Sequence, residues 1–313
     1  GDEGKAYIDD FLSGFMEDSY VDGKIYSIPF QRSTEILFYN KDAFKEVGLD
    51  PEKAPATWDE LVEDAQKLTN ENRYGVGIAL NSGSAQWTFT GFCLQNSTDG
   101  QNLMSEDGKS VYFNTPENVE ALQFWLDLQN EYKCMAEGIV QWTDLPTQFL
   151  AGEVAMIYHT TGNMANIHDN ADFDFGTAFL PAHKRVGAPT GGGNFYISSN
   201  ISEDRVQAAW KFIKFATSTD RAAQWSLDTG YVATRQSCFD TDLIKDYYAE
   251  VPQASVAYEQ LPYAKPELTT YNAAEIWRVL NDNIQAAVVG DMSAQEALDA
   301  AQEQAEEVLS EYQ

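Results

Sequence analysis

The sequence predicts an α/β fold, because segments typical of strands alternate along the chain with segments typical of helices. Its 313 residues are enough for two packed domains of ordinary size. Apolar residues make up 43% of the chain and aromatic residues 13%, so it can fill hydrophobic cores and still have aromatic side chains to spare. We therefore expect layers of strands and helices rather than a repeat protein or a disordered chain.

The predicted strands are short runs rich in β-branched and aromatic residues. They span residues 24–30, 35–40, 74–80 and 152–159, with further runs at 173–180 and 195–198. The strand at 152–159 ends in the polar turn 160–163, and the run at 195–198 follows three glycines. Strand ends of this kind expose backbone N–H groups that can contact a ligand.

The predicted helices carry apolar residues at helical spacing. Thr57 and Glu60 form a capping box before a helix at 59–69, and Ser293 and Glu296 form a second box before the long acidic helix near the C-terminus. Further amphipathic helices are predicted at 116–131 and 205–216. No run of about eighteen apolar residues occurs, so no membrane span is predicted.

The charge balance is strongly acidic, with 49 acidic against 20 basic residues and a formal net charge of −29. Such a field repels nucleic acid and anionic lipid, and it disfavours anionic solutes unless a local basic pocket overrides it. We interpret it as a means of keeping an abundant secreted protein soluble. We expect no nucleic-acid partner.

Cysteine and histidine are scarce. They are Cys93, Cys134, Cys238, His159, His168 and His183. No spacing typical of a zinc site or a disulfide framework occurs. A single disulfide bond between two of the three cysteines is left as an alternative. We expect no metal and no cofactor.

Seven short motifs share a definite order along the chain. They are IPF at 28–30, LFYNKDAFKEVGLDPEKAPATWDEL at 37–61, FLAGEVAMIYHTTGNMANI at 149–167, FDFGTAFLPA at 173–182, GGGNFYIS at 191–198, TGYVATR at 229–235 and GDMSAQEALDAAQ at 290–302. In this order they resemble the solute-binding proteins of ABC importers, the family that includes the maltose-binding and glycerol-3-phosphate-binding proteins. The resemblance runs through nearly the whole chain.

This resemblance implies a periplasmic-binding-protein-like fold, in which two α/β lobes joined by crossing strands close on a solute like a hinge. The implied crossings lie near 36–41, 173–180 and 229. The implied lobes are 1–36 with 176–228, and 41–172 with 230–313. Family members carry further N-terminal residues that supply the first strands of the first lobe, so we expect this lobe to be incomplete.

The resemblance also implies location and partners. We expect an extracytoplasmic protein, in the periplasm or as a cell-surface lipoprotein, that docks on the permease subunits of a membrane importer. The chain opens without a start methionine, and we expect that a targeting segment has been removed. We expect a monomer, or copies that exchange strands if the N-terminal strands are truly absent.

A sugar site needs flat aromatic platforms for C–H faces and fixed partners for hydroxyl groups. Trp277 lies thirteen residues before Gly290. By resemblance, the maltose-binding protein has a sugar-stacking tryptophan there, whereas the glycerol-3-phosphate binders have an arginine. Arg278 takes this place if the register differs by one residue, and a core tryptophan on a helix is the alternative. Tryptophan at this position favours a sugar as the solute.

Two further tryptophans are candidate platforms. Trp87 falls in the predicted loop after 74–80, where the family walls its cleft, although the run WTFTGF is equally consistent with core packing. Trp142 precedes the helix that leads into the 149–167 motif and is a second candidate. The remaining tryptophans sit on helical faces and are predicted to be core: Trp58, Trp125, Trp210 and Trp225.

The polar ligand contacts are predicted from the resemblance and from local geometry. They are Ser33 and Glu35 at the first crossing, Thr160 and Thr161 in the turn, Gly191, Gly192 and Asn194 in the glycine run, and Tyr231 and Arg235 at the return crossing. Each has a structural alternative: a helix N-cap for the threonines, a tight turn for the glycines, and an ion pair for Arg235.

Two rival functions remain. A glycosidase would also combine aromatic residues with carboxylates, but no catalytic motif such as GxSxG occurs, and we expect no enzyme. A glycerol-3-phosphate or phosphodiester binder of the same fold would need a cluster of cations in the cleft. Only Arg32, Arg235 and Arg278 are available for this among the motifs placed there.

Overall fold

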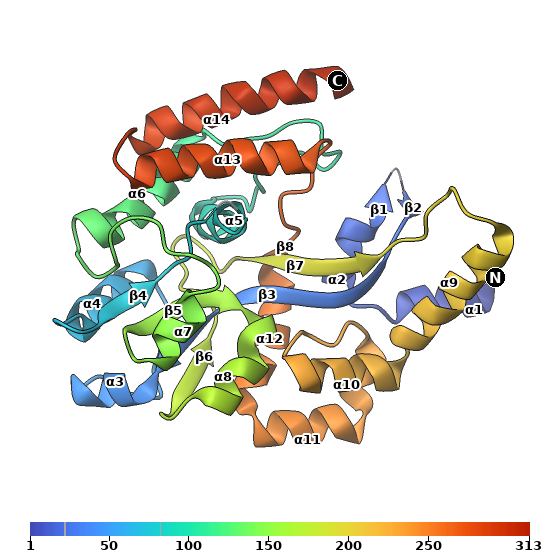
Figure 1. Ribbon diagram of the computed structural model, residues 1–313, viewed down its shortest axis with the longest axis horizontal. Helices are drawn as coiled ribbons and strands as arrows, with labels where there is room; N and C mark the ends of the chain where they lie inside the picture. The colour runs from blue at the N-terminus through green and yellow to red at the C-terminus, as the bar shows by residue number, and fades with distance from the viewer. Residues whose placement is uncertain (22, 82) are drawn as a thin grey trace.

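The computed structural model describes residues 1–21, 23–81 and 83–313 (Figure 1). Over these ranges its main sheet has six strands in the order β4-β5-β3-β7-β8, with β6 also paired to β3. The strands are β3 (Ile28–Asn40), β4 (Tyr74–Gly77), β5 (Val154–Thr160), β6 (Phe175–Ala178), β7 (Ala188–Phe195) and β8 (Ala264–Lys265). A small hairpin, β1 (Tyr20–Val21) with β2 (Lys24–Ile25), precedes β3. The α/β prediction is confirmed.

The central strand differs from the prediction of two separate strands at 24–30 and 35–40. The structure has one continuous strand β3, which bulges between Pro29 and Gln31. Its first half pairs with β7, and its second half pairs with β5 and β6. The polar run QRST at 31–34 lies between the two predicted strands, yet Arg32 and Thr34 are buried and hydrogen-bonded inside the protein.

The glycine run was also placed wrongly, since residues 191–193 do not precede a strand but lie within β7. Gly191 pairs with Ser33, and Gly192 pairs with Arg32. Gly192 has a φ of +107°, and a Cβ there would lie 2.0 Å from the Gln31 carbonyl oxygen. Glycine therefore serves close approach of β7 to β3, rather than a turn.

The helical predictions are confirmed with small shifts at their ends. The helices concerned are α4 (Trp58–Leu68), α6 (Pro116–Asn130), α9 (Glu203–Ala216) and α14 (Ala294–Leu309). The box at Ser293 and Glu296 is complete. At the first box, Thr57 accepts from the Glu60 N–H, but the Glu60 carboxylate accepts from the Ala56 N–H instead.

The remaining α-helices are short, except for α5 and α13. They are α1 (Asp2–Asp9), α2 (Ser13–Met16), α3 (Lys41–Glu46), α5 (Ala85–Asn96), α7 (Leu145–Leu150), α8 (Met164–Asn170), α10 (Thr219–Thr229), α11 (Asp242–Glu250), α12 (Ser255–Gln260) and α13 (Ala273–Val288). Single 3₁₀ turns are η1 (Glu17–Ser19), η2 (Thr161–Asn163), η3 (Gln236–Asp240), η4 (Pro252–Ala254), η5 (Leu261–Tyr263) and η6 (Ser310–Tyr312). Helices α13 and α14 lie above the sheet in Figure 1, and α10 and α11 lie below it.

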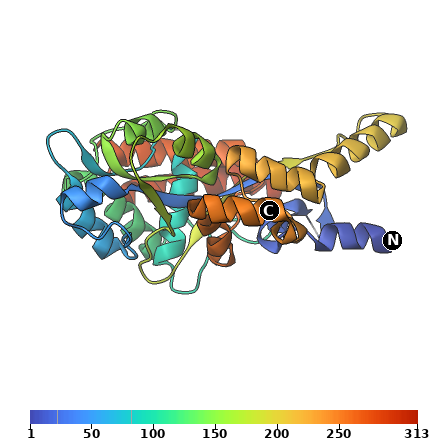
Figure 2. The same cartoon turned by 90° about the horizontal axis from the view of Figure 1, so that it is seen from below.

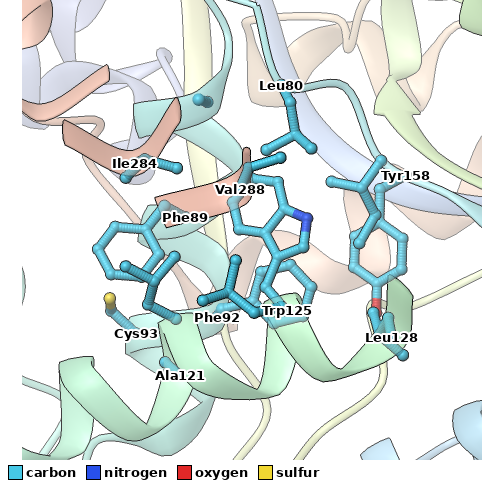
Figure 3. Close-up of a cluster of buried hydrophobic side chains, with 14 of the residues drawn as sticks. Leu80, Phe89, Phe92, Cys93, Ala121, Trp125, Leu128, Tyr158, Ile284 and Val288 are labelled. Carbon is cyan, nitrogen blue, oxygen red and sulfur yellow. The ribbon is translucent and has the colours of Figure 1, made fainter. Parts of the chain in front are cut away.

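Buried apolar residues form three clusters. The largest joins α5, α6, α13 and α14, and Figure 3 shows side chains such as Phe92, Trp125 and Ile284 pointing toward one another within it. The second surrounds β5, α7, α8, α10 and α11. The third is small and includes Phe11 and Ile213. It lies where α1 and α9 extend beyond the rest of the molecule (Figure 2).

The third cluster joins residues from both segments that were predicted to form the first lobe. Ala222 and Ala223 of α10 were assigned to the same lobe, yet they pack in the second cluster. The residues of the predicted first lobe are thus divided between two clusters, and the lobe boundary at 228 stays a prediction.

The described residues contain no helix long and apolar enough to cross a membrane. They also contain no group of three or more histidine, cysteine or acidic side chains placed to hold a metal ion. The three cysteines are buried and their thiols are free, which answers the question of a disulfide.

Candidate functional site

The predicted site residues of β3 lie at the junction with β5 and β7. Glu35 pairs with Thr160 at the end of β5, and Ser33 pairs with Gly191 of β7. The sheet register thus places the first crossing, the polar turn and the glycine run beside one another, although they are far apart in sequence.

Trp87 covers this junction from the first turn of α5. It is 8% exposed, and its Nε1–H donates to the Thr190 carbonyl oxygen at 2.9 Å. A Cβ on Gly191 would lie 2.8 Å from the Trp87 Nε1 atom, so the indole requires glycine there. The prediction that Trp87 lies in a loop is wrong. Every residue of α5 is buried, so the helix has no polar face that would reveal it in the sequence.

Trp142 meets Trp87 edge-on, with ring centroids 5.7 Å apart at 67°. It also stacks on the His159 imidazole, with centroids 3.8 Å apart. Trp142 is partly exposed, whereas His159 is fully buried. We call Trp87, Trp142 and His159 the aromatic wall.

The polar turn begins where the aromatic wall ends. Thr160 caps η2 by accepting from the Gly162 N–H at 3.2 Å, so the N-cap alternative holds for this residue. The Thr161 hydroxyl is buried and has no hydrogen-bond partner among the described residues. Tyr231 lies against the turn, since a Cβ on Gly162 would be 2.8 Å from its Cζ atom. The turn therefore holds a buried hydroxyl group without a partner in the described ranges, and the Tyr231 ring lies against it.

Glu35 is fully buried and faces α5. Its Oε1 accepts from the Thr88 hydroxyl at 2.5 Å, while Oε2 is buried without a partner among the described residues. Burial raises the pKa of Glu35 to about 8, against the smaller opposing effect of the Thr88 hydrogen bond. The carboxyl is therefore neutral at pH 7 and ties β3 to α5. Ser33 is also buried.

The cations near the predicted site are paired with carboxylates. Arg32 donates to Asp18 at 2.7 Å, and both side chains are nearly buried. Arg235 donates to Asp10 at 2.6 Å and to the Thr217 carbonyl oxygen at 3.1 Å. The ion-pair alternative is therefore what the structure shows for Arg235, and its predicted ligand contact lacks support.

Two further candidates are engaged inside the protein. Asn194 accepts from Arg32 at 3.4 Å and donates to Ser27 at 2.9 Å. Trp277 is partly buried against the largest core cluster, and its Nε1–H donates to the Leu268 carbonyl oxygen at 2.5 Å. These contacts favour the core alternative for Trp277, whose role as a platform stays a prediction.

Sequence reasoning missed His159 and Thr88. His159 carried no metal-ligand spacing and was set aside, although its place at the end of an apolar strand, directly before a polar turn, was a usable signal. Thr88 lay in the segment that was interpreted as a loop.

A cavity with a volume of about 1160 Å³ lies elsewhere among the described residues. It is bounded by η1, β1, the loop at 100–108 and the segment at 265–271. It shares no residue with the predicted site, and the aromatic wall does not line it. The aromatic wall and the turn therefore remain a predicted site, which rests on the chemistry of their side chains.

Comparison with known proteins gives a family. The model of the bacterial extracellular solute-binding protein family matches residues 1–253. The sn-glycerol-3-phosphate-binding periplasmic protein UgpB of Escherichia coli strain K12 is 29% identical over 321 residues, covering 96% of this chain and 71% of the relative.

Similar solved structures bind different solutes. UgpB from Mycobacterium tuberculosis in complex with glycerophosphocholine has a TM-score of 0.86 at 26% identity, covering 99% of this chain and 77% of that one. Maltose-bound T. maritima MalE3 has a TM-score of 0.85 at 25% identity, covering 98% and 78%. The cyclic α-maltosyl-1,6-maltose binding protein from Arthrobacter globiformis has a TM-score of 0.83 at 26% identity, covering 98% and 78%.

Proposed function

The chain belongs to the bacterial extracellular solute-binding proteins, and from this premise we propose that its solute is a neutral sugar or short oligosaccharide. As the solute-binding component of an ABC importer, it works outside the cytoplasm. We expect a monomer that passes its solute to the permease subunits without chemical change.

The aromatic wall beside the polar turn carries the proposal. Trp142 is partly exposed, and we propose that its indole packs on the C–H face of a sugar ring. The turn that follows His159 carries the unpartnered Thr161 hydroxyl, and Tyr231 lies against this turn. We propose both as hydrogen-bonding groups for solute hydroxyls. Maltose and a cyclic maltosyl sugar are the solutes of two similar structures, which supports the same class here.

The paired arginines argue against a phosphate group. Arg32 and Arg235 each form an ion pair with an aspartate, and Arg278 donates to Glu275 and Asp282 on the exposed face of α13. A phosphate that displaced one of these carboxylates would break its ion pair. This would leave a carboxylate without its partner, at a cost that is large when the pair is buried.

A glycerol phosphodiester is the second candidate. The likeness to UgpB, in sequence and in the complex with glycerophosphocholine, favours it. It would require a cation from outside the residues that form the aromatic wall and the turn.

Isothermal titration calorimetry of the full chain separates the two candidates. The probes are maltose and maltotriose on one side, and sn-glycerol-3-phosphate and glycerophosphocholine on the other. We expect heat of binding from at least one neutral sugar and none from the phosphates. Binding of a phosphate compound together with silence toward both sugars would overturn the proposal.

The site assignment has its own test. Trp142→Ala should weaken sugar binding about tenfold, the loss expected from one aromatic contact. Trp210→Ala is the matched control, because Trp210 is also partly buried but contacts Tyr7 of α1 instead of the aromatic wall. Equal affinities for the two variants would remove Trp142 from the site.

A further inference from the structure

His159 is a buried histidine for which the proposed function has no use. It lies one residue before the end of β5, where it pairs with Ile36 of β3. Its side chain is fully buried and contacts two parts of the candidate site, Trp142 and Asn163. It is the one buried imidazole within the described residues, since His168 and His183 are exposed.

The hydrogen bonds define the state of the imidazole. Its Nε2 lies 3.2 Å from the Trp142 carbonyl oxygen, which can only accept. Its Nδ1 lies 2.6 Å from the Asn163 side-chain nitrogen, which can only donate. Asn166 donates to the Asn163 oxygen at 3.4 Å and so supports this orientation of the amide. The ring is therefore neutral, with its proton on Nε2.

Burial supports the same state. It lowers the pKa of His159 to about 4, while hydrogen bonds with the backbone of Trp142 and Thr160 oppose this shift. Titratable groups on the neighbouring elements are Glu35, on β3 opposite Thr160, and Tyr231, beside Gly162. Glu35 faces Thr88 of α5 and stays protonated near neutral pH. His159 therefore remains uncharged across the physiological range.

Trp142 needs an external support because it lies in an irregular segment between α6 and α7. Its N–H donates to Asn81 at 3.1 Å, and its carbonyl oxygen accepts from His159. Its indole also stacks on the imidazole, with the two planes 28° apart. One buried side chain thus fixes both the backbone and the ring of Trp142.

We propose that His159 is a positioning residue, which holds the Trp142 indole and the turn at 160–163 in one fixed arrangement for a neutral solute. The inference rests on the proposed function, since it treats Trp142 as the platform and the turn as the hydroxyl-binding element. It adds that an uncharged imidazole sets the distance between them. Solute affinity should consequently be independent of pH from about 5 to about 7, where Glu35 also stays protonated.

The first experiment compares His159→Phe with His183→Phe. Phenylalanine keeps an aromatic ring but removes both hydrogen bonds. His183 is the matched control because it also stacks on a tryptophan, Trp58, but is exposed. We expect His159→Phe to weaken maltotriose binding about tenfold and His183→Phe to leave it unchanged. Equal affinities in two folded variants would overturn the inference.

If the wild-type protein binds no sugar, the proposed function is wrong, but nuclear magnetic resonance can still test the positioning role of His159. We expect the nitrogen shifts of His159 to report a neutral ring with its proton on Nε2. We also expect His159→Phe to move the indole resonance of Trp142 and the amide resonances of the turn together. Movement of neither set, or of only one, would contradict the positioning role.

The variant Asn163→Asp tests the positioning role through the pH dependence of solute affinity. This dependence would not change if His159 only stabilised the fold. A carboxylate opposite Nδ1 would accept a proton there, raise the pKa of His159 and favour a charged ring. We expect maltotriose affinity to become dependent on pH between about 5 and about 7. The control is Asn170→Asp, at the exposed end of α8. A flat pH profile for Asn163→Asp would count against the inference.

Discussion

Two histidine–tryptophan stacks occur among the described residues, and they are built in opposite ways. In one, the buried His159 supports the partly exposed Trp142, with centroids 3.8 Å apart. In the other, the exposed His183 covers the buried Trp58, with centroids 4.6 Å apart and planes at 11°. The same pair of rings therefore presents an indole outward in one place and an imidazole outward in the other.

The supports of the two indoles explain this difference. Trp58 begins α4, stacks on Phe124 at 4.2 Å and donates to Gln95 at 2.8 Å, so helix and core hold it without His183. Trp142 has no helix or strand of its own, and it is held by Asn81, the second core cluster and His159. Stacking alone therefore does not identify a functional pair. The informative features are which ring is buried and what else holds the other ring.

Truncation of the two histidines should give the largest contrast. His159→Ala leaves the Trp142 carbonyl oxygen and the Asn163 amide without a partner and creates a buried cavity. It should lower the free energy of unfolding by about 3 kcal/mol. His183→Ala removes an exposed ring and should cost less than about 0.5 kcal/mol. Urea denaturation of both variants checks this, and similar losses would remove the distinction between the stacks.

The pH dependence of stability sharpens the contrast. The unfolded chain protonates His159 below about pH 6.5, whereas the folded imidazole stays neutral down to about pH 4. The unfolded state thus binds more protons in this window, and stability falls as the pH decreases through it, by about 3 kcal/mol in total. His159→Gln should lose this slope, and His183→Gln should keep it. An unchanged slope in His159→Gln, measured by denaturation at several pH values, would contradict the assignment of a buried neutral ring.

The dependence of stability on pH has the opposite sign for Glu35, which lies near the same site. Its folded pKa is raised to about 8, so the folded state holds a proton that the unfolded chain releases above about pH 4.5. Its contribution is fully present below about pH 4.5 and is lost as the pH rises toward 8. Glu35→Gln should therefore raise stability by about 2 kcal/mol more at pH 6.5 than at pH 5. The exposed Glu106→Gln serves as control, and an equal effect at both pH values would argue that Glu35 is not buried in its neutral form.

The sequence predicted the surroundings of these residues better than their contacts. The strand at 152–159, the polar turn and the helices with a polar face were found because each has a periodicity or a cap that a local pattern reveals. Helix α5 was not found, because a helix buried on all sides has no such period. The continuous β3 was missed because its polar residues are satisfied by partners distant in sequence, such as Asp18 and Gln260.

The site shows the same limit. Trp87, Trp142 and Tyr231 could be proposed from residue type and resemblance, and the structure places them at one junction. The engagement of Arg235 with Asp10, and of Trp277 with Leu268, depends on pairs far apart in the chain or on a loop conformation. The proposed role of His159 could not be predicted from the sequence either, because its two hydrogen bonds form only when the fold brings Trp142 and Asn163 to the imidazole.

Removal of one indole N–H from each region is the smallest and most specific test. Trp87→Phe loses the bond to Thr190, and Trp58→Phe loses the bond to Gln95, so each should cost about 1 kcal/mol of stability. Only Trp87 meets Trp142 and packs on Gly191, so only its variant should weaken maltotriose binding, by about fivefold. The paired measurement separates a contact that shapes the site from one that only stabilises the fold. If both variants bind equally well, the aromatic wall ends at Trp142, and Trp87 belongs to the core as its burial alone would suggest.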